Sequence, residues 1–228
     1  MMVLPEGIRI ERFQNRVIVI DRETRLLGVA LHNTDPTLDI LETDLNLNLS
    51  RIFQRVPAFF MNTYQNPFPF EISRNLQPGD RLEIVNQSLT DFVAIFQDRK
   101  GPDMYAEGLL FSGDVATVQV PSGIYILHTL IGMERDASNT FHPSAFQTKV
   151  YVDGKKIMEG PMHALMSRPG YVRIMRVPIY QNLTVEVATG SSTSKPQVVA
   201  VFKRIHARTY EKEHETRPDH HRTEAVVR

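Results

Sequence analysis

Histidines are the first residues of this sequence whose side chains could bind a metal or transfer a proton. A metal site needs ligands that converge within about 2.0–2.2 Å of the ion. None of the histidines has a histidine partner two or four positions away on a plausible strand or helix. We therefore expect core or surface imidazoles, with no metal and no other cofactor. The eight histidines are His32, His128, His142, His163, His206, His214, His220 and His221.

Carboxylates could also do chemistry, because a pair of acids can hydrolyse a glycosidic bond. Five acids lie on or near expected strands: Glu83, Asp91, Glu107, Asp114 and Glu186. Acids in such positions are typical of a solvated sheet face. The sequence contains no Gly-x-Ser-x-Gly nucleophile motif and no glycine-rich phosphate loop. We therefore expect a protein that is not an enzyme, and keep a hydrolase with a strand carboxylate as a lesser alternative.

Charge and cysteine content exclude several further classes of function. Lys plus Arg and Asp plus Glu number 26 each, so no bulk charge attracts nucleic acid or an anionic membrane. Arg173 and Arg176, within a late basic cluster, would point to opposite faces of a strand, so we expect no specific nucleic-acid site. With no cysteine, the fold has neither disulfides nor thiolate metal sites. The cluster consists of Arg168, Arg173, Arg176, Lys203, Arg204 and Arg208.

The elements that must position these residues are strands. Between residues 76 and 133, turns built from Pro and Gly twice lead into a strand that is apolar on at least one face. Asp153-Gly154 between two alternating runs predicts a type I′ hairpin. Residues 8–32 form strands, residues 38–49 a helical turn and then a strand, and no repeat of fixed period is evident. The other expected strands are Phe70–Ser73, Arg81–Asn86, Asp91–Gln97, Met104–Phe111, Val115–Val120, Ile124–Ile131, Gln147–Val152, Lys155–Glu159, Tyr171–Val177, Leu183–Ala188 and Gln197–Arg204.

Two of these turn-and-strand stretches resemble strands of the cupredoxin family. They are Pro78–Asn86 and Pro121–His128, and in that family such strands carry a copper-binding histidine. The resemblance covers about a quarter of the chain. The cysteine thiolate of a blue-copper site is absent here, so the resemblance implies a β-sandwich and no copper.

The segment from Val56 to Phe70 combines five aromatic residues with three prolines. Such a segment either lies buried under the sandwich or forms a contact surface. In the second interpretation it acts together with Tyr210 of the charged C-terminal tail. The expected subunit-contact residues are Phe59, Phe60, Tyr64, Phe68, Phe70 and Tyr210.

We therefore predict an all-β fold, a β-sandwich of the jelly-roll type. Residues 1–58 form an N-terminal β-rich arm or extra strands, residues 59–207 the sandwich, and residues 208–228 a charged tail. A chain of 228 residues that is 42% apolar can bury such a core without disulfides.

These features predict a non-enzymatic assembly protein, a virus or phage capsid component. Its partners would be copies of itself and other virion proteins, and its location the virion, assembled in the host cytoplasm. No secretory signal is evident at Met1–Gly7, and the longest apolar run is shorter than the roughly 20 residues of a membrane span. The alternative is a carbohydrate- or receptor-binding module with Tyr64, Phe68, Tyr105 and Tyr125 as a sugar platform.

Overall fold

The computed structural model describes residues 7–65, 68–86, 88, 91–168, 173–190 and 193–205. Tyr210 and the expected tail, residues 208–228, lie outside these ranges. Within the described residues, strands dominate and no helix is long and apolar enough to cross a bilayer. The prediction of an all-β sandwich is confirmed.

The first eight strands form a complete jelly roll. They lie in two sheets, with strand orders β1-β8-β3-β6 and β2-β7-β4-β5. The first strand pairs with the eighth, the second with the seventh, the third with the sixth and the fourth with the fifth. This nested antiparallel pairing defines the jelly roll. The elements are β1 (Ile8–Arg12), β2 (Val17–Val19), β3 (Thr24–Leu31), a 3-10 turn (Pro36–Leu38), β4 (Glu42–Leu47), β5 (Ser50–Pro57), a second 3-10 turn (Ala58–Phe60), β6 (Phe70–Leu76), β7 (Arg81–Val85) and β8 (Phe92–Gln97).

The remaining strands repeat the same topology. The sheet β10-β16-β13-β14 faces a sheet in which β9, β17, β11 and β15 are neighbours. This repeat could not be predicted from the sequence, because it lies in the order in which the strands pair and not in a repeated pattern of residues. The elements are β9 (Met104–Gly108), β10 (Val115–Gln119), β11 (Tyr125–Arg135), β12 (Phe141–His142), β13 (Gln147–Val152), β14 (Lys155–Pro161), α1 (Met162–Leu165), β15 (Val177–Ile179), β16 (Asn182–Ala188) and β17 (Lys195–Arg204).

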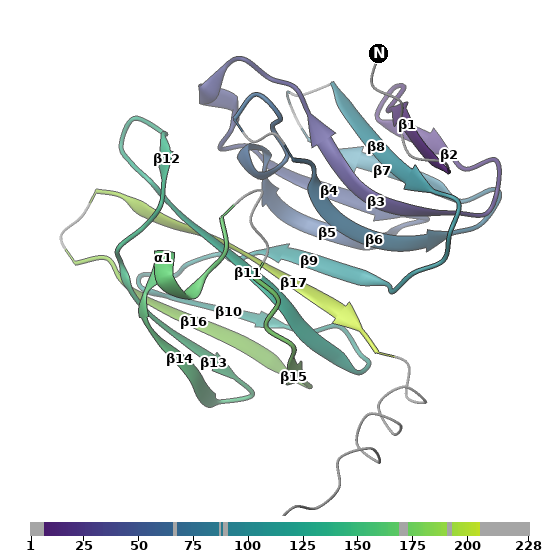
Figure 1. The fold of residues 1–228 in the computed structure, drawn as a ribbon. Helices are drawn as coiled ribbons and strands as arrows, with labels where there is room; N and C mark the ends of the chain where they lie inside the picture. The colour runs from purple at the N-terminus through teal and green to yellow at the C-terminus, as the bar shows by residue number, and fades with distance from the viewer. Residues whose placement is uncertain are drawn as a thin grey trace, which may run out of the picture.

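One continuous sheet joins the two jelly rolls (Figure 1). β5 of the first roll pairs in parallel with β9 of the second, with Phe53 opposite Ala106. Nine strands thus belong to one sheet, eight of them in the order β12-β11-β17-β9-β5-β4-β7-β2 and the ninth, β15, paired with β11. The structure has two hydrophobic cores. β17 supplies Val199 and Val201 to the first core and Ala200 and Phe202 to the second.

We call β9, β17 and β11 the septum, because their two faces are turned toward different cores. Residues Val198–Phe202 are all buried. Burial on both faces explains why β17 is a continuous apolar run and does not alternate.

The division expected after residue 58 does not coincide with the boundary between the rolls. Residues on both sides of it, such as Phe53 and Phe60, belong to the first core. The change from one roll to the next falls between Gln97 and Met104. Residues 8–57 are thus part of the first jelly roll, because their strands need β6, β7 and β8 as hydrogen-bonded partners.

Two local predictions have clear outcomes. Asp153 and Gly154 both have positive φ, 49° and 78°, and Val152 lies opposite Lys155, which confirms the type I′ hairpin. In the expected strand Tyr171–Val177, residues 173–176 are irregular and β15 begins only at Val177; residues 171 and 172 lie outside the described ranges.

Candidate functional site

A cavity of about 350 Å3 lies between the two jelly rolls, and we call it the inter-roll groove. One wall comes from β3, β6 and the segment before β6, and the other from β11. β6 is the edge strand of its sheet. The lining residues are Arg25, Leu27, Phe60, Phe68, Pro69, Phe70, Glu71, Ser73, Met104, His128, Thr129, Ile131, Arg168 and Val201.

Strand alternation places the groove residues of β3 and β6, apart from Phe70, on the outer face of their sheet. Leu26 and Ile72 point into the first core, whereas their neighbours Leu27, Glu71 and Ser73 line the groove. Phe68 adds an aromatic side chain that is 55% exposed. The groove is therefore mainly apolar with a few polar groups, which is the usual composition of a small-molecule site.

Arg25 is held in place by a chain of hydrogen bonds. Its Nε donates to Ser73 Oγ at 2.8 Å, and the Ser73 hydroxyl donates to the Pro102 carbonyl. The guanidinium lies against Gly101, where an added Cβ would be 2.2 Å from Arg25 Cζ. Only a glycine leaves room for Arg25 in this position.

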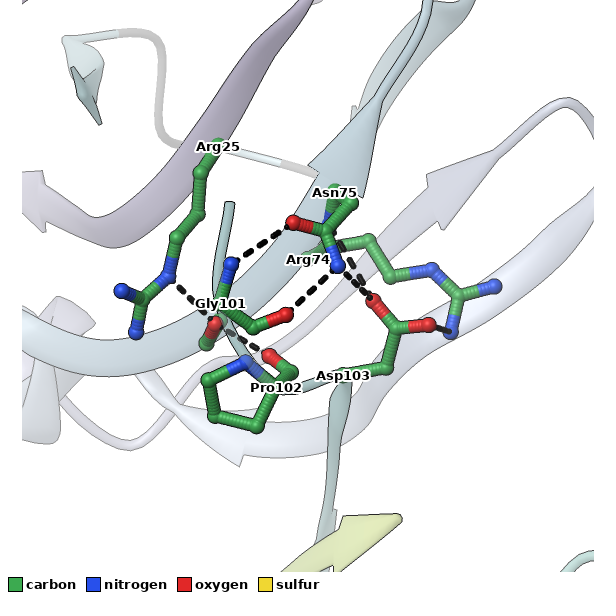
Figure 2. Close-up of polar contacts among 7 residues, drawn as sticks. Arg25, Arg74, Asn75, Gly101, Pro102 and Asp103 are labelled. Atoms are coloured by element: carbon green, nitrogen blue, oxygen red, sulfur yellow. Dashed lines mark hydrogen bonds and ion pairs between the residues drawn. The ribbon is translucent and has the colours of Figure 1, made fainter. Parts of the chain in front are cut away.

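The connection between the rolls supports this arrangement (Figure 2). The Asn75 side chain donates to the Gly101 carbonyl at 2.6 Å and accepts from the Gly101 amide at 2.9 Å. The Asp103 carboxylate accepts from the backbone and side-chain amides of Asn75, both at 3.1 Å. The backbone carbonyl of Asp103 accepts a hydrogen bond from the Arg204 amide at 2.8 Å. The segment between the two rolls is therefore bonded both to β6 and to β17 of the septum.

His128 lines the groove because of a β-bulge. The register of β11 against β17 shifts between Leu127 and Thr129, which leaves His128 as the extra residue. Burial lowers the pKa of His128, and Lys203 and Arg176 add to this effect, while Glu71 opposes it. The imidazole is therefore neutral at pH 7.

The remaining charged groups of the groove are Arg168, which follows α1, and the exposed Glu71. Neither has an ion-pair partner within 4 Å among the residues that the structure describes, and the same holds for Arg25. The groove thus presents two guanidinium groups and one carboxylate. Sequence reasoning missed it because its residues come from distant strands.

The expected subunit-contact residues have separate positions in the structure. Phe59, Phe60 and Phe70 are 8%, 2% and 3% exposed, and Phe59 stacks on Phe141 with ring centroids 4.1 Å apart. These three side chains cannot reach a neighbour while the fold is kept, because they form part of the first core. Tyr64 and Phe68 are the exposed members of the expected contact surface among the described residues, and Tyr210 lies outside those residues.

The carboxylates singled out in the sequence do not line the groove. Glu107 is buried, forms an ion pair with Arg55 and accepts a hydrogen bond from the Tyr105 hydroxyl. Asp114 and Glu186 lie together at a shallow hollow on the outside of the second roll, near Lys149. This grouping is typical of a solvated face with ion pairs.

The expected sugar platform is not formed as one surface. Tyr125 is 7% exposed and belongs to the second core, and Tyr105 stacks on Phe202. Tyr64 and Phe68 alone remain accessible among its four residues. Across the described ranges, no group of three or more histidine, aspartate or glutamate residues could hold a metal ion.

No protein-family model matches the chain, and no curated protein matches it. Several solved structures are weakly similar. PNGase F, a glycosylasparaginase from Flavobacterium meningosepticum, is 11% identical over 87% of this chain and 89% of its own, with a TM-score of 0.33. The major capsid protein P2 from Bacteriophage PM2 is 8% identical over 88% and 98%, with a TM-score of 0.41. The tandem CBM51 modules of a family 98 glycoside hydrolase from Streptococcus pneumoniae are 10% identical over 87% and 81%, with a TM-score of 0.26.

These neighbours include an enzyme, a capsid protein and modules of a glycoside hydrolase, and TM-scores this low support no function for the present chain. The strand pairings themselves define its class. It is an all-β protein of two tandem jelly rolls, joined by one sheet, with an apolar groove between them.

Proposed function

We propose that this chain is a non-enzymatic structural protein that assembles with copies of itself and with other virion proteins, as a virus or phage capsid component. The observation that carries the proposal is the tandem repeat of the jelly roll across one continuous sheet. Jelly rolls occur in capsid proteins, and also in lectins and cupins, so the step from fold to function is an analogy.

The physical support is that the two rolls behave as one block. The septum is buried against both cores, so the rolls cannot move apart without exposing apolar surface. A chain that carries the same unit twice presents related surfaces on both sides. Related surfaces favour repeated contacts of one kind, which closed symmetric assemblies require.

The proposed contact surface contains Tyr64 and Phe68, which are 60% and 55% exposed. Aromatic side chains are enriched at protein interfaces. Tyr64 also packs edge-on against His32, with ring centroids 6.0 Å apart, so its ring is held in place before a neighbour binds. This lowers the entropic cost of a contact.

The test is mass photometry of the full-length protein across concentration, with negative-stain images of the large species. We expect rings, sheets or shells from the wild type. The double substitution Tyr64→Ser and Phe68→Ser should shift the assembly to higher concentration. Leu49→Ser is the matched control, because Leu49 is 96% exposed in the β4–β5 hairpin. A protein that stays monomeric at all concentrations would refute the proposal.

A second candidate, a carbohydrate- or receptor-binding module, is favoured by the inter-roll groove with its exposed Phe68 and charged rim. In this case the groove is a ligand site. A glycan array on the monomeric protein tests it. Glycan binding that is lost when Phe68 is replaced by serine would support this candidate, whereas an array without hits would exclude glycans as ligands.

A further inference from the structure

We infer that the inter-roll groove binds a small amphipathic anion, with an apolar body and one carboxylate, sulfonate or phosphate group. This deepens the second candidate function and rests on the groove being a ligand site. Phe68 belongs both to the groove and to the proposed contact surface, so a ligand and a neighbouring subunit would compete for it. The shape and lining of the groove, its two arginines and the hydrogen bonds that hold Arg25 support this inference.

The body of the ligand is specified by the apolar lining. Leu27, Phe68 and Ile131 come from different segments of the two walls and turn apolar side chains to the same cavity. A volume of about 350 Å3 is near the lower end of the range of about 300–1,000 Å3 for ligand pockets. The groove therefore suits a small molecule and not a folded partner.

The anionic group is specified by Arg25 and Arg168. Both line the groove, and neither forms an ion pair with a described residue. A guanidinium presents a planar set of donors that matches a carboxylate or phosphate. Glu71 is the single carboxylate in the lining, and it is exposed, where solvent screens its repulsion of an anion.

Arg25 is prepared for this task before a ligand arrives. In Figure 2 its only dashed line leaves Nε, and no line reaches the two terminal nitrogens. Ser73 and Gly101 fix the position of the guanidinium, with one terminal nitrogen against Gly101, so its remaining donors need little further loss of side-chain entropy to bind an anion.

A neutral sugar fits the lining less well than an amphipathic anion. Sugars need many hydrogen-bond acceptors as well as donors. The Ser73 hydroxyl already donates to Pro102 and accepts from Arg25. Among the charged side chains of the lining, only Glu71 is an acceptor.

The test compares two fluorescent probes that share one aromatic body. Anilinonaphthalene sulfonate carries an anionic group, and phenylnaphthylamine lacks it. Both are titrated into the full-length wild type and into Arg168→Gln and Arg25→Gln. Arg81→Gln is the matched control, because Arg81 is exposed on β7 and lines a different hollow with Asn46 and Glu83.

We expect the wild type to bind the sulfonate at least tenfold more tightly than the neutral probe. Each groove variant should weaken sulfonate binding about tenfold, as expected for the loss of one hydrogen bond to a charged group. Binding of the neutral probe should not change. Arg168 has no described hydrogen bond, so its variant should fold normally even if Arg25→Gln does not.

Four outcomes overturn the inference. Equal affinity for the two probes would reject the anionic group as part of the ligand, and so would sulfonate binding that neither groove variant changes. In both cases the groove would remain a ligand site. An equal loss in Arg81→Gln shows that the probe responds to overall charge, and this also rejects it. No binding of either probe rejects the groove itself, and mass photometry of the same samples reports separately on assembly.

Discussion

Replacing Gly108 by alanine should weaken the junction between the two jelly rolls. Gly108 ends β9, next to the parallel pairing of β9 with β5. A Cβ built on Gly108 would lie 1.8 Å from the carbonyl oxygen of Arg55 and 2.7 Å from its carbonyl carbon. These are backbone atoms, so β5 or β9 has to move.

The magnitude follows from the groups that a shift would disturb. Overpacking of a tight site costs about 1–3 kcal/mol. Arg55 also donates its backbone N–H to Asp44 Oδ1 at 2.7 Å and pairs with Glu107, whose side chain is 7% exposed. Because a displaced Arg55 leaves that carboxylate less well paired, we expect the upper end of the range, about 3 kcal/mol.

The assay is urea and thermal unfolding, with Gly101→Ala as the matched control. At Gly101 the three atoms nearest the added Cβ all belong to the Arg25 side chain and none to the backbone, so Arg25 can move aside by giving up its hydrogen bond to Ser73, at a cost of about 1 kcal/mol. For a chain of this size, 3 kcal/mol lowers Tm by about 6–12 °C. Equal destabilisation by the two substitutions, or a loss below about 1 kcal/mol for Gly108→Ala, would show that the close approach does not hold the rolls together.

Three further predictions concern the hairpins and the groove. Leu49→Gly should stabilise the protein by about 0.5–1 kcal/mol in urea unfolding. Leu49 has a φ of 74°, which strains a side chain but not a glycine, and it is 96% exposed, so little packing is lost. A loss of stability would contradict this reasoning. Asp153→Ala should cost about 2 kcal/mol, because the carboxylate accepts the backbone N–H groups of Tyr180, Gln181 and Asn182 at 2.8–2.9 Å, and Asp153→Asn, which keeps one oxygen, should cost less. Burial raises the pKa of Asp153 but these three hydrogen bonds together lower it, so the difference between wild type and Asp153→Ala should be present above pH 3.8 and shrink as the pH falls through the lowered pKa. Burial lowers the pKa of His128 below 6.5, so the unfolded chain binds a proton on this imidazole more readily than the folded chain does. The free energy of unfolding should therefore fall as the pH drops below 6.5. Between pH 7 and pH 5 it should fall less for His128→Gln than for wild type.

Much of the secondary structure could be predicted from the sequence. Alternation and turn chemistry predicted most of the strands and the Asp153-Gly154 hairpin, because these depend on neighbouring residues. The strand β5 was not predicted, since its polar residues Arg51, Gln54 and Arg55 hide the alternation. Its side chains reach partners such as Glu107 that are distant in sequence.

The candidate site could not be predicted, and the reasons are physical. Arg25 and His128 are about a hundred positions apart in the sequence, and only the pairing order of the strands brings them to one cavity. The bulge at His128 has no sequence signature in β11. The aromatic segment was ambiguous for a related reason: Phe60 is buried against Phe141, a residue about 80 positions away, whereas Phe68 is exposed.

The position of β17 has a consequence for how the protein is made. This strand is the last described element in the chain, yet it lies between β11 and β9 and contributes to both cores. A growing chain on the ribosome can therefore pair the eight strands of its first jelly roll early, but the core of that roll lacks Val199 and Val201 until β17 has emerged. Until then the part of the first core that β17 covers stays exposed, and exposed apolar surface of this kind makes a folding intermediate prone to aggregation.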